Sequence, residues 1–178
     1  MSSTLDASAP LRQLITAVPD FPSAGITFRD ITPLLGNPSV FADAITAMVE
    51  PWRAAGITHV IGIESRGFIF GAPVALALGA GFVPIRKPGK LPRAVMREEY
   101  ALEYGTDVLE MHADALPAGA RVLIVDDVLA TGGTAVAALQ LVQQLNADVA
   151  GYAFLIELTA LGGRQRLGGA RAQSLVAY

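Results

Sequence analysis

The sequence has no cysteine, which excludes disulfide bonds, thiolate metal sites and a cysteine nucleophile. Charged residues are also scarce: they make up 16% of the 178 residues, and the formal net charge is −3. A protein that binds duplex nucleic acid needs a concentrated basic face, so this balance argues against nucleic acid as a partner. It leaves room for a small anionic substrate, because a few cations and helix N-termini can bind one.

Signals that direct a chain to a membrane are missing as well. The N-terminus, MSSTLDASAP, has neither the basic region nor the apolar region of a signal peptide. Residues 67–85 carry no charge and reach the length of a membrane span, but glycines and prolines divide them into a helix, a turn and a strand. We therefore expect a cytoplasmic protein without a membrane partner.

Hydrophobic residues, in contrast, are abundant. They make up 52% of the chain, which is enough apolar surface to form a sizeable core and argues against disorder. Nothing in the sequence repeats, and no low-complexity linker divides it. A length of 178 residues suits one domain of ordinary size, so we expect a single domain over residues 1–178.

Short apolar runs alternate with helical patterns along most of the chain. The runs predict buried strands at 59–63, 81–85, 121–125 and 149–158, and the helical patterns lie at 38–54, 67–79 and 133–145. Buried strands that alternate with helices are typical of an α/β protein with a mostly parallel sheet flanked by helices. Residues 94–113 differ because they are polar, aromatic and charged, and they predict an exposed hairpin that could act as a lid.

The segment Val122 to Thr134, VLIVDDVLATGGT, carries the clearest functional signal. An apolar strand leads to Asp126 and Asp127, and a loop of small residues then opens a helix. Ligands of open α/β sheets bind at the carboxyl ends of the strands. The backbone N–H groups of the loop and the positive end of the helix can bind phosphate. The aspartates would repel phosphate and instead suit sugar hydroxyls or a divalent cation.

Each part of this segment also has a purely structural interpretation. A glycine-rich turn is often only a tight connection, and an aspartate at a strand end is often a helix cap. The combination of strand, paired aspartates and loop favours a ribose-phosphate site. The loop is neither a nucleotide P-loop, because no GK[ST] follows, nor a dinucleotide site, because GxGxxG is absent.

Residues 122–134 resemble the signature with which the type I phosphoribosyltransferases bind 5-phosphoribosyl-1-pyrophosphate (PRPP). Further stretches resemble the adenine phosphoribosyltransferases in particular, and they lie at 20–35 (DFPSAGITFRDITPLL), 62–71 (GIESRGFIFG), 84–92 (PIRKPGKLP), 102–110 (LEYGTDVLE) and 156–167 (IELTALGGRQRL). One departure is Glu64, where some members carry another residue. The resemblance implies the type I phosphoribosyltransferase fold, with a flexible hairpin hood at about 94–113.

The resemblance also implies an activity. The chain would transfer the 5-phosphoribosyl group from PRPP to adenine, forming AMP and pyrophosphate in purine salvage, with Mg²⁺ as cofactor and as a homodimer. The residues implied to hold the 5-phosphate are Ala130, Thr131, Gly132, Gly133 and Thr134. Asp126 and Asp127 would hold the ribose hydroxyls. Mg²⁺ would be held mainly by PRPP, and Asp126 or Asp127 are the only protein groups we consider as direct ligands. A branched side chain at Gly132 is expected to fill the space of the phosphate.

The pyrophosphate site is implied to begin at Ser65 and Arg66, after a cis peptide bond between Glu64 and Ser65. The basic residues implied to complete it are Arg86, Lys87 and Lys90. Considered without the family, Arg66 fits the task because its planar guanidinium suits phosphate oxygens, and a surface arginine is the alternative. A basic run on a proline- and glycine-containing loop is more often a solvated face.

The base and its chemistry are implied to involve three residues. Phe28 and Arg29 lie in a segment that would close over adenine, although the sequence considered without the family favours Phe28 as part of the core. Glu103, near the tip of the hairpin, would assist a proton of the purine, and a solvated surface carboxylate is the alternative. We therefore expect Glu103→Gln to slow turnover, with Glu110→Gln as an inert control.

Two other functions compete with this one. The first is a phosphoribosyltransferase for another 6-substituted purine, such as hypoxanthine or xanthine. The second is a regulator that senses PRPP and has lost catalysis. A regulator would need an added DNA-binding module of roughly 60 residues, and the segment before the first strand of the sheet is too short and too acidic for one.

Overall fold

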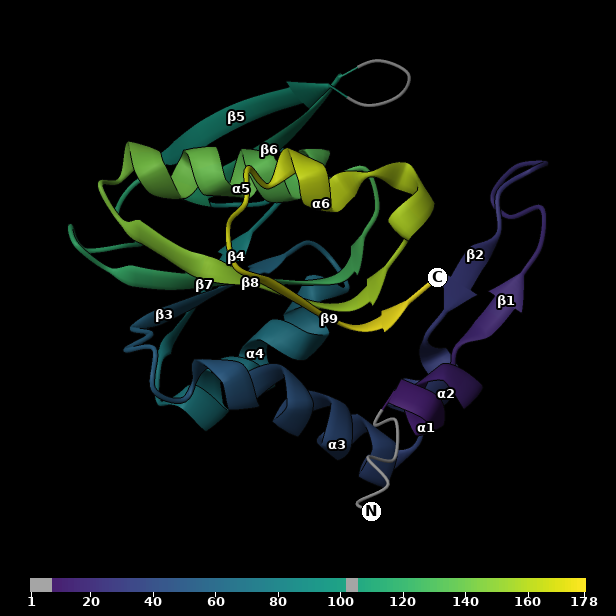
Figure 1. Ribbon diagram of the computed structural model, residues 1–178. Coiled ribbons are helices and arrows are strands. Elements are labelled where there is room, and N and C mark those ends of the chain that lie inside the picture. Colours follow the sequence, from purple (N-terminus) through teal and green to yellow (C-terminus); the bar gives the residue numbers. More distant parts are fainter. Residues whose placement is uncertain (1–7, 102–105) are drawn as a thin grey trace. The chain divides into compact units, whose positions relative to one another are not determined.

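The structure, a computed structural model, describes residues 8–101 and 106–178 (Figure 1). These residues form two compact units, which divide between Ala47 and Met48. Our expectation of one domain over residues 1–178 stays a prediction. The tip of the expected hood, including Glu103, lies outside the described residues.

The N-terminal unit is a small helical segment with a two-stranded sheet. Its elements are α1 (Ser8–Gln13), β1 (Thr16–Val18), β2 (Phe28–Asp30), α2 (Thr32–Leu35) and most of α3 (Pro38–Val49). β1 and β2 pair antiparallel. Asp30 organises the turn into α2, because its carboxylate accepts hydrogen bonds from the Thr32 backbone N–H at 2.9 Å and from the Thr32 hydroxyl at 2.7 Å. Such a local cap satisfies a donor that has no partner inside the helix.

The helix predicted at 38–54 is shorter than expected. α3 starts at Pro38 as predicted but ends at Val49, and residues Glu50–Trp52 form a 3₁₀ turn. Pro51 explains the difference, because proline has no backbone N–H and its ring disfavours the α conformation in the residue before it.

The second unit contains a five-stranded sheet that is parallel throughout, in the order β4-β3-β7-β8-β9. The strands are β3 (His59–Ile63), β4 (Gly81–Ile85), β7 (Arg121–Leu129), β8 (Asp148–Glu157) and β9 (Ala172–Ala177). The predicted bounds of β3 and β4 are confirmed, β7 runs four residues further than predicted, and β9 was not predicted. The α/β class with a mostly parallel sheet is therefore confirmed.

Helices cover both faces of this sheet (Figure 1). α4 (Gly67–Leu78) packs against β3, β4 and β7, and α5 (Gly133–Gln144) packs against β7 and β8 on the other face. The short α6 (Gly163–Arg166) follows a 3₁₀ turn (Thr159–Leu161) and contacts α5. Residues 67–85 thus form a helix and a strand as predicted. Within the described ranges, no helix is long and apolar enough to cross a bilayer.

The hairpin predicted at 94–113 is present. β5 (Val95–Ala101) and β6 (Thr106–His112) pair antiparallel, and α5 packs against both strands. The base of the hairpin is tied to the segment after β4, because the backbone groups of Arg86 and Glu110 exchange two hydrogen bonds of 2.9 and 2.7 Å. The hairpin is therefore anchored beside the carboxyl end of β4.

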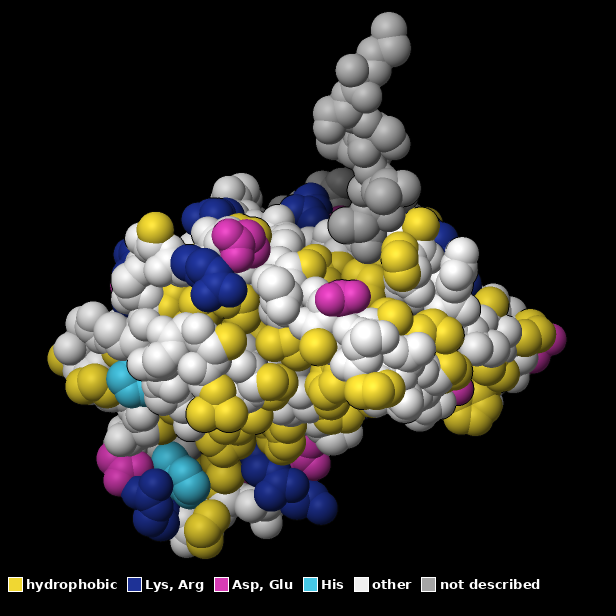
Figure 2. Space-filling model, turned by 90° about the horizontal axis from the view of Figure 1, so that it is seen from below, with side chains coloured by type: hydrophobic (Ala, Val, Ile, Leu, Met, Phe, Trp, Pro, Cys, Tyr) yellow, Lys and Arg dark blue, Asp and Glu magenta, His cyan; other side chains and the backbone are white. Residues whose placement is uncertain are grey.

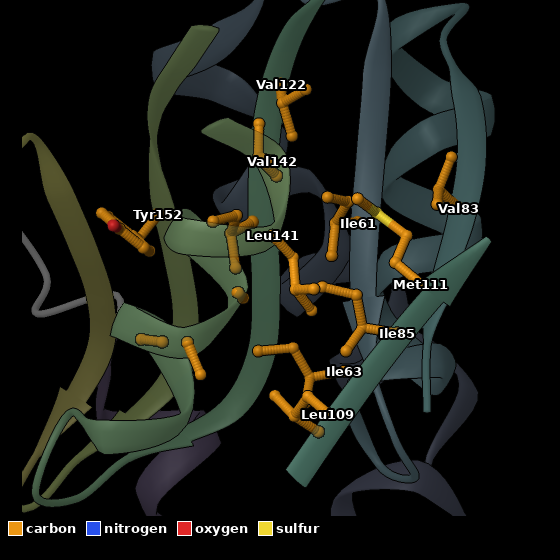
Figure 3. Packing of buried hydrophobic residues seen from close by; sticks show 14 of the residues in the cluster. Ile61, Ile63, Val83, Ile85, Leu109, Met111, Val122, Leu141, Val142 and Tyr152 are labelled. Atoms are coloured by element: carbon orange, nitrogen blue, oxygen red, sulfur yellow. The ribbon is translucent and has the colours of Figure 1, made fainter. Parts of the chain in front are cut away.

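The core of the second unit lies between the sheet, α5 and the hairpin. Figure 3 shows side chains of β3, β4 and β6 that point toward one another, among them Ile63, Ile85 and Leu109. All three are essentially inaccessible to solvent. Burying a side chain of this size contributes about 1.5–3 kcal/mol, so this cluster fixes the hairpin base and the strand ends relative to each other.

Candidate active site

The carboxyl ends of β3, β4 and β7 surround a cavity of about 410 Å³ in the second unit. Its lining is mostly polar and comes from the segments that follow β3 and β4, from β7 and its loop, and from the hairpin. The lining residues are Glu64, Ser65, Arg66, Lys87, Tyr100, Leu109, Asp126, Asp127, Val128, Ala130 and Thr134. A ligand site at this edge is what a parallel α/β sheet favours.

A second, smaller hollow of about 50 Å³ adjoins this cavity at the start of α5. It is lined by the loop residues Ala130, Thr131 and Gly132, by Thr134, and by apolar side chains that include Phe154. Asp126, Val128, Ala130 and Thr134 line both hollows. The structure therefore brings the predicted phosphate residues and the predicted ribose residues to one place. Gly133, the remaining predicted phosphate residue, is buried as the first residue of α5 and lies between Gly132 and Thr134 in the chain.

The conformation of the loop depends on Gly132. This residue has φ +82°, precedes α5 and accepts the first hydrogen bond of the helix from Val136 at 3.0 Å. A positive φ favours glycine. A Cβ at this position would lie 2.7 Å from the carbonyl oxygen of Gly163. The expected damage from Gly132→Val therefore has a different cause from the one predicted, because the first added atom meets the backbone of Gly163.

The two aspartates lie within β7 and not after its end, since the strand continues to Leu129. Asp127 is 4% exposed, and its Oδ2 lies 2.7 Å from Nε of Arg66. Desolvation raises the pKa of Asp127 although the charge of Arg66 opposes the rise. Desolvation raises the pKa of Asp126 well above its usual value, and the neighbouring charge of Asp127 adds to this effect. Hydrogen bonds from hydroxyl groups, or a bound cation, would therefore stabilise the charged form of this pair.

The segment after β3 carries the predicted pyrophosphate residues. The Glu64–Ser65 peptide bond is cis, as the resemblance implied. Ser65 is exposed, Arg66 directly precedes α4, and both line the cavity. The alternative of a plain surface arginine does not fit Arg66, because its guanidinium contacts the buried carboxylate of Asp127.

The basic residues after β4 have different places. Lys87 lines the cavity, whereas Arg86 and Lys90 are not among the residues that line it in the described parts of the chain. Arg86 Nε donates to Glu64 Oε2 at 3.1 Å, and the Lys87 backbone N–H donates to the same oxygen at 3.0 Å. Burial alone would raise the pKa of Glu64, but these two hydrogen bonds lower it. Glu64 therefore links the segments after β3 and β4.

The hairpin supplies residues that sequence reasoning missed. Asp107 forms an ion pair with Lys87, and the Tyr100 hydroxyl donates to Asp107 Oδ2 at 3.2 Å. Burial opposes the charged form of each partner, but their hydrogen bond raises the pKa of Lys87 and lowers that of Asp107. No local pattern could reveal this contact, because Lys87 and Asp107 meet only when the hairpin packs beside β4.

Glu110 has a structural role, so it is unsuited as the inert control that we expected. It is 1% exposed, its Oε1 lies 2.6 Å from Nε of Arg97, and its Oε2 accepts a 3.0 Å hydrogen bond from the Gly89 backbone N–H. A buried carboxylate with such partners is costly to disturb. Glu99, which is exposed on β5, is the better control.

The residues predicted to contact the base lie in the N-terminal unit. Phe28 and Arg29 are adjacent in β2. Phe28 lines a mostly apolar hollow of about 210 Å³ together with Val18, Phe21 and Asp30. The rings of Phe21 and Phe28 meet edge to face, with centroids 5.3 Å apart. Phe28 is half-buried, and this exposure favours a ring available for stacking over a core residue.

A family model described as "Phosphoribosyl transferase domain" matches residues 31–167, which is most of the chain. The chain therefore belongs to the phosphoribosyltransferases, as the fold and the two adjoining hollows indicate. The most similar relatives indicate which kind of phosphoribosyltransferase the chain resembles. An adenine phosphoribosyltransferase of Acaryochloris marina is 59% identical over 168 residues, covering 94% of this chain and 99% of that protein.

Solved structures agree with this assignment. A crystal structure of the adenine phosphoribosyltransferase from Rhodothermus marinus has a TM-score of 0.93 and 54% identity, covering 97% of this chain and 98% of that one. The yeast adenine phosphoribosyltransferase, solved in complex with adenine and an imino-altritol bisphosphate, has a TM-score of 0.89 and 44% identity, covering 95% of this chain and 98% of that one. The predicted family and fold are confirmed, and within the phosphoribosyltransferases the chain groups with those specific for adenine.

Proposed function

We propose that the two adjoining hollows bind PRPP and that the enzyme transfers its 5-phosphoribosyl group to adenine, forming AMP and pyrophosphate. The observation that carries this proposal is the small hollow at the start of α5, which opens into a cavity lined by both cations and paired carboxylates. Loop N–H groups at a helix N-terminus suit the 5-phosphate, and Asp126 and Asp127 suit the ribose hydroxyls. Arg66 and Lys87 suit the pyrophosphate.

In the reaction, N9 of adenine attacks C1 of PRPP while the bond to pyrophosphate breaks. The transition state resembles that of glycosyl transfer, in which positive charge develops on the sugar. The protein does not need a covalent nucleophile. Arg66 and Lys87 would stabilise the negative charge that develops on the leaving group, and the loop would hold the ribose phosphate in line for attack. The carboxylates of Asp126 and Asp127 would orient the ribose.

The donor set also fits Mg²⁺ as the cofactor. Among the described residues no group of three or more acidic or histidine side chains could hold a metal ion. Mg²⁺ is commonly bound by one or two carboxylates together with substrate phosphates, so Asp126 and Asp127 with PRPP would supply enough oxygen ligands. When bound, Mg²⁺ would neutralise pyrophosphate charge.

Adenine would stack on Phe28, with Arg29 beside it, and Glu103 would exchange a proton with the purine. The support for Phe28 is the hollow that it lines with a second aromatic ring. The proposed role of Glu103 is supported by its position in the LEYGTD stretch, which resembles the family. Cytoplasmic location stays a prediction from the sequence.

A homodimer fits the exposed hydrophobic side chains of the second unit. Leu76 and Ile69 on α4 are 83% and 38% exposed, and Phe82 on the edge strand β4 is also exposed. Figure 2 shows hydrophobic side chains, in yellow, that reach one face of the protein. Exposed hydrophobic groups of this kind often mark a protein interface. Sedimentation of the purified protein at micromolar concentration tests this expectation.

A panel of bases tests the reaction. The protein is incubated with PRPP, Mg²⁺ and either adenine, hypoxanthine, xanthine or guanine, and nucleotide and pyrophosphate are measured. We expect AMP and pyrophosphate in equal amounts and a strong preference for adenine, since a site that pairs with the exocyclic amine leaves polar groups unpaired with a carbonyl. Comparable efficiency with hypoxanthine, xanthine or guanine would contradict adenine specificity. PRPP binding without turnover of any base would favour a regulator.

A further inference from the structure

The phosphate loop packs backbone to backbone against the start of α6. A Cβ added to Gly163 would overlap the carbonyl oxygen of Ala130 and lie 3.0 Å from the backbone nitrogen of Gly132. In the opposite direction, a Cβ on Gly132 would lie 2.7 Å from the carbonyl oxygen of Gly163. Neither segment has room for a side chain at the contact. The two glycines therefore allow an approach that no other pair of residues permits.

α6 is itself held firmly by the sheet. Arg164 Nε donates to Glu157 Oε1 at 2.9 Å, and its Nη1 donates to the carbonyl oxygen of Ala172 at 2.8 Å. Glu157 is 7% exposed at the end of β8, and the hydrogen bond from Arg164 lowers the pKa of this carboxylate. Leu167, just after α6, is 5% exposed. The contacts on both sides make α6 a support fixed to β8 and β9.

A third contact ties the helix to the loop. Arg166 Nη1 donates to the carbonyl oxygen of Thr131 at 3.4 Å. Loop residues 130–132 are thus in contact with Gly163 and Arg166, which follow them by some thirty residues in the chain.

We propose that Gly163 is a positioning residue for PRPP: it holds the phosphate loop in the conformation that forms the small hollow. This inference rests on the proposed function, in which that hollow takes the 5-phosphate. A hydrogen-bonding loop works best when its donors are held in place before the ligand arrives, and a displacement of about 1 Å can cost about a hundredfold in rate. Gly163→Ala should displace Ala130 and Gly132 and so misplace the donors.

The displacement should affect one part of PRPP and not the other. Ribose 5-phosphate uses the loop and the aspartates of β7, whereas pyrophosphate uses Ser65, Arg66 and Lys87 on the segments after β3 and β4. Gly163→Ala should therefore weaken binding of ribose 5-phosphate at least about tenfold and change the affinity for pyrophosphate by less than about twofold. A general loss of folding would weaken both ligands together.

Calorimetric titration of ribose 5-phosphate, and separately of pyrophosphate with Mg²⁺, into the full-length protein tests the proposal. Gly168→Ala is the matched control, because Gly168 lies two residues after α6 and a Cβ there meets no atom within 4 Å. Its φ of +63°, which Gly163 does not share, adds backbone strain to this variant, so unchanged binding would show that local strain near α6 does not by itself weaken the ligands. We expect the control to bind both ligands like the wild type.

A second variant keeps the test decisive if Gly163→Ala does not fold. Arg164→Gln leaves the glycine contact in place but releases α6 from Glu157, and it should also weaken ribose 5-phosphate selectively. Equal affinity of wild type and variant for ribose 5-phosphate, or an equal loss for both ligands in a folded variant, would overturn the role of Gly163. Wild-type protein that binds neither ligand would instead overturn the proposed function.

Discussion

Asp126→Asn should make the ligand-free protein more stable while it weakens PRPP binding. The carboxylate of Asp126 is desolvated and lies beside the charge of Asp127, and both effects raise its pKa. Asparagine has the same shape, has no charge, and keeps an oxygen that can accept the 2.9 Å hydrogen bond from the Asp127 backbone N–H. The substitution thus removes the unfavourable charge and little else.

The size of the gain follows from the cost of burying an unpaired charge. A desolvated carboxylate costs more than a neutral amide of the same shape, and the partial solvent exposure of Asp126 keeps this difference small. We expect the free energy of unfolding to rise by about 1–2 kcal/mol at pH 8. For a chain of this length the midpoint of thermal unfolding should rise by about 2–8 °C.

The gain should depend on pH in one direction. Below the unfolded pKa of about 3.9 the aspartate is neutral in both states, so the wild type carries no penalty there. As the pH rises through the unfolded pKa to the raised folded pKa, the unfolded chain releases its proton first and the wild type loses stability. The advantage of Asp126→Asn is therefore complete above the folded pKa and disappears near pH 4.

Urea unfolding of both proteins at pH 8 and pH 4 measures this difference, and calorimetry with PRPP and Mg²⁺ measures the functional cost. The lost charge-assisted hydrogen bond should weaken PRPP binding by roughly 1.5–3 kcal/mol. Asp148→Asn is the control, since Asp148 is an exposed carboxylate paired with Arg121, and it should change stability by under about 1 kcal/mol. A variant that is less stable than wild type at pH 8, or equally stabilised at both pH values, would refute the reasoning.

The hairpin and its contacts lead to further predictions. Glu103→Gln should lower the single-turnover rate at least about 10²-fold with Glu99→Gln near wild type, and a loss of only a few-fold would leave Glu103 a surface carboxylate. Asp107→Asn should tighten pyrophosphate binding by up to about fivefold, because it frees Lys87 from a partly exposed ion pair. Calorimetry at low and high salt checks this, and weaker binding would show that Asp107 orients Lys87. Asp127→Asn should also weaken PRPP binding, because it removes a carboxylate that would accept from the ribose hydroxyls and that contacts Arg66, and the same calorimetry measures the loss.

The sequence predicts well those features that local patterns control. β3 and β4 have the predicted bounds because each is a short apolar run between residues that favour turns. α3 was predicted too long because its apolar spacing continues to Trp52, and the backbone effect of Pro51 outweighs that spacing. β9 was missed because AQSLVA has a weak apolar pattern and becomes a strand by pairing with β8.

The sequence by itself indicated the phosphoribosyltransferase class, through its resemblance to that family, and the proposed ribose-phosphate site, because strand β7, its aspartates and the loop before α5 are contiguous in the chain. The resemblance to the phosphoribosyltransferases added Ser65, Arg66 and Lys87, and all three line the cavity at the carboxyl ends of the strands. Only the tertiary structure decided that Asp107 pairs with Lys87, that Glu110 is buried, and that Gly163 must be a glycine. These features arise where segments distant in the chain come into contact, and no local pattern of residues records such a contact.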